Sequence, residues 1–126
     1  MVYSFRINKY IDQHSGIGKS NPLLEINDQE KYGWHFIDEI NNLSSNLGYV
    51  KEIVSYLDAL LKGEIDFYEG FGYEVYMIEC DKESAKVKNV FEDDKIEAVI
   101  PTQDIYKLMR DWRDYLIEWE SQNNVK

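Results

Sequence analysis

The stretch from Glu64 to Ile100 constrains the fold of this chain more than any other part of the sequence. Apolar and charged residues alternate along it, and short runs of Gly, Asp, Glu and Lys interrupt the alternation. A period of two places successive side chains on opposite faces of a β-sheet. The stretch therefore predicts three or four antiparallel strands. One face should lie on a core, and the other should face water and be mostly acidic.

Glycines and charged turns divide this stretch into its strands. Gly70 and Gly72 flank Phe71, which predicts a tight turn or a bulge between strands over Ile65–Glu69 and Tyr73–Cys80. In the second of these strands, two sets of side chains should point to opposite faces: Tyr73, Val75 and Met77 against Glu74, Tyr76 and Ile78. The remaining predicted elements are a turn at Asp81–Glu83, a strand at Ala85–Val90, a polar hairpin tip at Glu92–Lys95 and a closing strand at Ile96–Ile100.

Two amphipathic helices flank the predicted sheet. The first runs from Asn46 or Leu47 to Lys62, where the following Gly63 is typical of a helix end. The second starts at Thr102, a residue type that caps helices. Each helix carries one apolar stripe that can pack on a sheet. In the last helix this stripe consists of Ile105, Leu108, Met109, Trp112, Leu116 and Trp119.

The first 45 residues are expected to add a strand, a loop and a helix. Val2–Tyr10 alternates like a strand, whereas Asp12–Pro22 is rich in Gly, Ser and Asn and predicts a loop. Leu23–Ile26 is either a short strand or a continuation of that loop. A helix is expected over Gln29–Ser44, or else a turn up to Trp34 followed by a shorter helix.

Together these elements predict a single α+β domain over residues 1–126. It should contain an antiparallel β-sheet of four or five strands packed against two or three α-helices, including a long C-terminal helix. A chain of 126 residues can bury a core without disulfides or a structural metal. The single cysteine, Cys80, ends an apolar run and is expected to be buried.

The chain is strongly acidic, with 24 acids against 14 Lys and Arg and a net charge of -10. About two thirds of the acids follow residue 62. Binding to nucleic acid or to an anionic membrane requires a surplus of Lys and Arg, so neither is expected as a partner. A basic protein is compatible with this charge. The N-terminal residues lack a signal-peptide core, and no apolar run approaches the ~20 residues of a membrane span, which predicts a cytoplasmic protein.

Motifs for cofactor or metal binding are weak in this sequence. The run from Gly16 to Ser20 resembles part of a phosphate-binding loop, but Gln13 occupies the first glycine position and Pro22 follows too closely for a helix. His14 and His35 have no second His or Cys at metal-ligand spacing. We therefore expect no cofactor and no metal site.

Carboxylates and aromatic residues are interleaved along the predicted sheet. The carboxylates fall at positions expected to face water, where they could recognise a cationic partner. A Tyr exposed among them would be a suitable interface anchor, because Tyr is enriched at binding hot spots. The same carboxylates could alternatively form a catalytic pair or a divalent-metal site. The candidate partner-binding residues are Glu64, Asp66, Tyr68, Glu69, Glu74, Tyr76 and Glu79.

The order of these segments resembles that of small immunity proteins from bacterial polymorphic-toxin and contact-dependent growth inhibition systems. The resemblance covers Leu57–Trp119: a helix ending Leu-Leu-Lys-Gly-Glu, the strand Phe-Tyr-Glu-Gly-Phe-Gly-Tyr-Glu, two further strands, and the closing run Ile-Pro-Thr-Gln-Asp-Ile-Tyr-Lys-Leu-Met-Arg-Asp-Trp. It implies a cytoplasmic protein that binds one cognate toxin domain, often a nuclease, and blocks its active site or a neighbouring site. It implies no particular binding residues, because such families diverge at that surface.

Three hypotheses from different classes follow. The leading hypothesis is a non-catalytic immunity protein, monomeric or weakly homodimeric, that neutralises a basic toxin domain through an acidic, Tyr-containing surface. The second is a small hydrolase that uses the carboxylates, with or without a metal. The third is a structural or regulatory subunit that homodimerises through a sheet edge.

Overall fold

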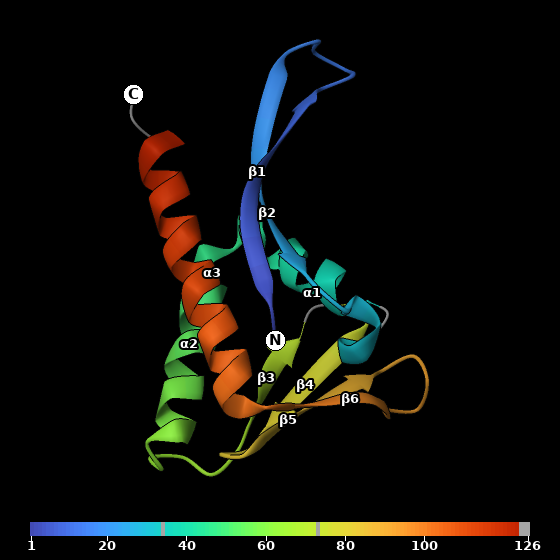
Figure 1. Ribbon diagram of the computed structural model, residues 1–126, viewed down its shortest axis with the longest axis vertical. Coiled ribbons are helices and arrows are strands. Elements are labelled where there is room, and N and C mark those ends of the chain that lie inside the picture. The colour runs from blue at the N-terminus through green and yellow to red at the C-terminus, as the bar shows by residue number, and fades with distance from the viewer. Residues whose placement is uncertain (34, 73, 124–126) are drawn as a thin grey trace.

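The structure is a computed structural model that describes residues 1–33, 35–72 and 74–123. Within these residues it contains a long β-hairpin, a four-stranded antiparallel sheet and three α-helices, of which the C-terminal helix is the longest (Figure 1). This confirms the predicted α+β class and the long C-terminal helix. The strands form two separate sheets, because the N-terminal hairpin does not join the four-stranded sheet.

The N-terminal hairpin consists of β1 (Tyr3–Ile11) and β2 (Gly18–Ile26), which pair without interruption along their length. The predicted loop over Asp12–Pro22 is therefore wrong in its second half, because residues 18–22 belong to β2. The Gly, Ser, Asn and Pro residues there resemble a loop in composition, but Pro22 is tolerated in an edge strand. The turn itself spans residues 12–17 and closes through a hydrogen bond from the Gly16 amide to the Asp12 carbonyl (2.7 Å).

The segment after the hairpin forms short helical pieces instead of one helix. Gly33 has a positive φ of 106°, which ends the first piece, so the single helix predicted over Gln29–Ser44 is wrong. The alternative, a turn followed by a shorter helix, is confirmed, although Trp34 lies outside the described residues. The pieces are η1 (Gln29–Tyr32), α1 (Phe36–Asn42) and η2 (Leu43–Ser45).

The next helix, α2 (Leu47–Leu61), has the predicted boundaries. The Asn46 side chain accepts a hydrogen bond from the Tyr49 amide (3.2 Å) and caps the start. At the other end Gly63 has a φ of 76°, and the amides of Gly63 and Glu64 donate to carbonyls of the last turn. This is a Schellman end, as the Lys-Gly pair predicts.

The four-stranded sheet contains β3 (Tyr68–Gly72), β4 (Tyr76–Cys80), β5 (Ser84–Asn89) and β6 (Lys95–Pro101), in that order. The predicted boundaries Ile65–Glu69 and Tyr73–Cys80 are both shifted. Gly70 and Gly72 lie within β3, and a register shift between Tyr68 and Phe71 confirms the bulge. The turn follows Gly72, and Tyr73 lies outside the described residues.

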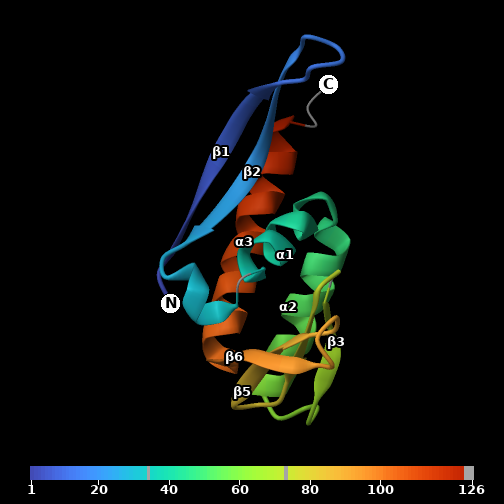
Figure 2. The same ribbon diagram turned by 90° about the vertical axis from the view of Figure 1, so that its right-hand side faces the viewer.

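The core lies between the inner face of the four-stranded sheet, α2 and the last helix, α3 (Thr102–Asn123). α2 packs on β3, and α3 packs on β5, β6 and the hairpin (Figures 1 and 2). Trp112 is fully buried and stacks on Phe5 of the hairpin, with ring centroids 5.5 Å apart. The apolar stripe predicted for α3 therefore connects the two sheets.

None of the helices in the described part of the chain combines the length and the apolar character that crossing a membrane would require.

Candidate interaction surface

Side chains of β4, β5 and β6 form an exposed outer face on the four-stranded sheet, opposite α2 and α3. Directly opposed residues of neighbouring strands point to the same side, so the pairing arranges these side chains in two rows. The rows that define this outer face are Met77, Lys88 and Ile96, and Glu79, Lys86 and Val99. The exposed fractions are 38% for Met77, 48% for Ile96 and 59% for Val99. In these rows Lys88 lies between Met77 and Ile96, and Lys86 lies beside Val99, so exposed apolar side chains alternate with lysines. With two Lys against one Glu, the predicted mostly acidic outer face is wrong.

Glu79, one of the predicted site residues, lies on this outer face but is paired. Its carboxylate lies 2.5 Å from the Nζ atom of Lys88, and both side chains are partly shielded. The hydrogen bond to Glu79 raises the pKa of Lys88 above its ordinary value. A partner that uses Glu79 would have to compete with Lys88.

Glu69 and Glu74 are brought together at one side of the outer face. Both line a shallow hollow of about 380 Å³, together with Met77 and Val90. Both carboxylates are exposed, and neither forms an ion pair with a described residue. The hollow therefore combines free negative charge with an apolar wall.

Glu64 and Asp66 lie elsewhere, in the exposed loop between α2 and β3. Because Tyr68 pairs with Cys80, this loop lies beside the β4–β5 turn. Glu74 lies in the turn at the opposite end of β4. The predicted set of carboxylates is thus divided between two ends of the sheet.

Tyr68 and Tyr76 are both buried, so neither is exposed on an acidic surface as expected, although Tyr76 lines the hollow together with Glu69 and Glu74. Tyr68 stacks on Tyr56 with ring centroids 4.6 Å apart, and burial raises its pKa. The hydroxyl of Tyr76 accepts a hydrogen bond from the His35 amide (2.9 Å), and burial raises its pKa as well.

The error has a structural cause. Three of the carboxylates that suggested an acidic face, Glu64, Asp66 and Glu74, lie in connections outside the strands. Their spacing relative to Tyr68 and Tyr76 therefore does not report a shared face. The bulge in β3 and the turn after it each change the phase of the alternation.

The sequence analysis did not identify two polar residues that shape this region. The buried carboxylate of Glu39 accepts hydrogen bonds from the amides of Glu74 (3.1 Å) and Val75 (2.7 Å). The Tyr49 hydroxyl accepts from the Gly72 amide (3.0 Å) and can donate its one hydrogen to the carbonyl oxygen of Gly70 or Gly72 in β3. Together these two side chains fix the position of the hollow. A carboxylate within the apolar run around Phe36 and Ile40 was the available signal for Glu39.

The remaining titratable groups are placed as follows. The Cys80 thiol is fully buried, and burial raises its pKa to about 12. His14 lies in the exposed hairpin turn, and the His35 ring packs against Tyr76. Lys19 forms an ion pair with Asp12 (2.7 Å) within the hairpin. In the described ranges, no three His, Cys, Asp or Glu side chains are grouped so that they could hold a metal ion.

Comparison with known proteins adds no relative: no family model, no curated protein and no solved structure matches the chain.

Proposed function

We propose that this protein binds and neutralises a basic protein domain, a bacterial toxin such as a nuclease, in the cytoplasm. The outer face and the hollow beside it form the proposed binding surface. The observation that carries the proposal is the hollow, where the unpaired carboxylates of Glu69 and Glu74 adjoin exposed apolar side chains.

The chemistry of the hollow suits a Lys or Arg side chain of the partner. Such side chains bury their aliphatic stems on apolar surface and keep the charged head near polar groups. Met77 and Val90 would contact the stem, and Glu69 and Glu74 would accept hydrogen bonds from the head. The remaining apolar residues of the outer face, Ile96 and Val99, take the anchoring role first expected of the tyrosines.

The surplus of acids around the sheet supports a basic partner, and it comes from the hollow and the connecting turns, because the outer face itself carries Lys86 and Lys88 against Glu79. Residues 63–101, which contain the whole four-stranded sheet, carry eleven of the 24 acids and four of the 14 Lys and Arg residues. Opposite charge steers two proteins together and raises the association rate by orders of magnitude at low ionic strength. The resemblance to immunity proteins points to the same class of partner.

Titration calorimetry with the toxin domain encoded beside this gene would test the proposal. We expect a 1:1 complex with submicromolar affinity that weakens as salt is raised from about 50 to 500 mM. Changing both Glu69→Gln and Glu74→Gln should weaken binding by about tenfold or more.

A matched double variant removes the same charge elsewhere. Glu30 and Glu118 are exposed and lie in η1 and α3, away from the outer face, so Glu30→Gln with Glu118→Gln should change the affinity less than about threefold. Equal effects of the two double variants would refute the assignment of the surface. Failure of the unmodified protein to bind the toxin domain at micromolar concentrations would refute the function.

A further inference from the structure

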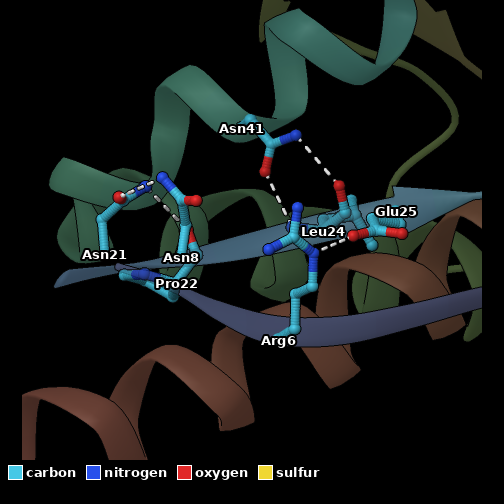
Figure 3. Close-up of polar contacts among 7 residues, drawn as sticks. All are labelled: Arg6, Asn8, Asn21, Pro22, Leu24, Glu25 and Asn41. Carbon is cyan, nitrogen blue, oxygen red and sulfur yellow. Dashed lines mark hydrogen bonds and ion pairs between the residues drawn. The ribbon is translucent and has the colours of Figure 1, made fainter. Parts of the chain in front are cut away.

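The two edges of the N-terminal hairpin differ in how their backbone groups are used. On β2 the Asn41 side chain clamps Leu24: its Oδ1 accepts from the Leu24 amide (2.8 Å) and its Nδ2 donates to the Leu24 carbonyl (3.0 Å) (Figure 3). Both backbone groups of Leu24 therefore point away from β1. In an antiparallel pair this orientation alternates along the strands, and opposed residues share it.

The register then shows which groups of β1 are free. Leu24 lies opposite Phe5, so the amide and carbonyl of Phe5 also point out of the hairpin, as do those of every second residue along β1. These residues are Tyr3, Phe5, Ile7, Lys9 and Ile11. Figure 2 shows β1 as the outermost strand on the side of the hairpin away from β2, at the left of the view, with no described helix or strand beyond it.

The other sheet edges are modified in ways that discourage further pairing. The β2 edge is occupied by Asn41 and contains Pro22, which has no amide hydrogen to donate. The β3 edge contains a bulge and is bonded by the Tyr49 hydroxyl. In β6 the register skips Glu97 and so forms a bulge. β1 pairs with β2 over its full length without bulge or proline, so its edge is a continuous template for another strand.

The sequence of β1 is suited to pair with itself. In an antiparallel pair centred on Ile7, Phe5 lies opposite Lys9 of the second copy, and Tyr3 lies opposite Ile11. The exposed apolar residues of β1 and its flank lie at the two ends, with exposed fractions of 64% for Val2, 46% for Tyr10 and 70% for Ile11. This register places Ile11 opposite Tyr3 and Tyr10 opposite Ser4 of the second copy, so Val2 and Tyr10 become diagonal neighbours across the contact.

The charges of the hairpin permit this contact in an otherwise acidic protein. Residues 2–26 carry three cationic and two acidic side chains, whereas the whole chain has a net charge of -10. Arg6, which would approach its symmetry mate across the centre, is already neutralised by Glu25 of the same hairpin (Figure 3). The paired strands run in opposite directions, so the acidic bodies lie at opposite ends.

We propose that two copies of this chain associate through their β1 edges in the register centred on Ile7. The two hairpins then form one four-stranded antiparallel sheet across the two-fold axis. The contact is a single strand pair with few side chains, which places it at the small end of specific interfaces. The dimer should therefore be concentration-dependent, with a dissociation constant on the order of 100 µM.

Light scattering of the protein alone, from about 10 µM to 1 mM, tests the proposal without any toxin. We expect the mean mass to rise from monomer toward dimer. Lys9→Pro removes an outward amide of β1 and should weaken association at least tenfold. Ser20→Pro is the matched control, because Ser20 lies opposite Lys9 and its amide points out of the β2 edge. Lys9→Ala controls for the lost charge, and neither control should weaken association more than threefold.

A monomer at 1 mM would overturn the proposal and would show that Arg6 and Lys9 are enough to block the edge. Equal weakening by Lys9→Pro and Ser20→Pro would overturn it as well, because the contact would then lie elsewhere. Circular dichroism establishes that each proline variant is folded. If one is unfolded, the cysteine experiment decides.

Cysteine cross-linking tests the register in folded protein. Residues directly opposed across a hydrogen-bonded antiparallel pair have Cα atoms about 5.5 Å apart, within the range for a disulfide. Ile7→Cys should therefore form a cross-linked dimer under mild oxidation, since the native Cys80 is buried. In this register the two Lys9→Cys positions of a dimer lie four residues apart along the paired strands, about 13 Å, so this variant should not cross-link. No Ile7→Cys dimer, or equal yields from both variants, would overturn the register.

Discussion

At the scale of single residues, a few buried polar side chains determine the shape of the proposed binding surface. Glu39 projects from α1 and accepts two amide hydrogen bonds from the β3–β4 turn, where Glu74 lies. A buried carboxylate of this kind is tolerated because its hydrogen bonds compensate for desolvation. The position of Glu74 at the hollow therefore depends on a residue far from it in sequence.

Replacing Glu39 tests this dependence. Glu39→Ala leaves the amides of Glu74 and Val75 without acceptors and should reduce the free energy of unfolding by about 3 kcal/mol. Glu39→Gln keeps one acceptor oxygen and should cost less. Urea denaturation measures both, with the exposed Glu30→Ala expected within about 0.5 kcal/mol of the unmodified protein. A cost for Glu39→Ala as small as that of Glu30→Ala would show that the hydrogen bonds contribute little.

Asp81 gives a prediction for pH. Its carboxylate accepts from the amides of Ser84 and Glu83 (2.8 Å each), and these bonds lower its pKa below the ordinary value of 3.8. A group whose pKa is lower in the folded state than in the unfolded chain stabilises the fold at pH values above its pKa in the unfolded chain. This stabilisation is lost as the pH falls through its pKa in the folded state.

Stability should accordingly decline as pH drops below about 4, and Asp81→Asn should show a smaller decline, because its amide oxygen accepts the same bonds without titrating. Urea unfolding at pH 7, 4 and 3 makes the comparison. Parallel losses in the two proteins would exclude Asp81 as a contributor to acid sensitivity.

At the scale of elements, the sequence predicted those whose boundaries depend on local signals. α2 begins and ends where its cap and Gly63 predict, and α3 begins at Thr102 as predicted, although the Thr102 hydroxyl donates to the Asp81 carbonyl (2.7 Å) and does not cap the helix. The inward set Ala85, Val87 and Asn89 of β5 follows a simple alternation. Prediction failed where pairing with a neighbouring strand determines the secondary structure of a segment. Residues 18–22 have the composition of a loop, and only pairing with β1 makes them a strand.

The edge of β3 offers a test at this scale. Tyr49→Phe removes the hydroxyl that bonds Gly72 and the neighbouring carbonyls, so the free energy of unfolding should fall by about 1–2 kcal/mol and the Gly72 amide should exchange faster. Tyr56→Phe is the control, because its ring stacks on Tyr68 while no described group is hydrogen-bonded to its hydroxyl. Hydrogen exchange at Gly72 that is unaffected by Tyr49→Phe would contradict the role of the hydroxyl.

At the scale of the whole molecule, α3 contacts both sheets. Its residues contact the hairpin through Trp112 and Phe5 and through a hydrogen bond from the Tyr3 hydroxyl to Asp111 (2.5 Å), and its other turns pack on α2, β5 and β6. Composition alone predicted the acidic character of the molecule. The hollow could not be predicted, because it arises from a bulge, a turn and a helix that meet only in the folded chain.

Unfolding should therefore be a single transition. Far-UV circular dichroism and tryptophan fluorescence, followed through the same urea titration, should give coincident midpoints and slopes. Two separated midpoints would show that the hairpin and the four-stranded sheet unfold independently.

The burial of Cys80 has a practical consequence for spectroscopy. Burial raises the pKa of the Cys80 thiol to about 12 and keeps the sulfur away from reagents, so the thiol is protonated and unreactive at neutral pH. A fluorophore or spin label directed at a cysteine introduced on the hairpin or on the outer face would therefore report from that position alone, without removal of the native residue.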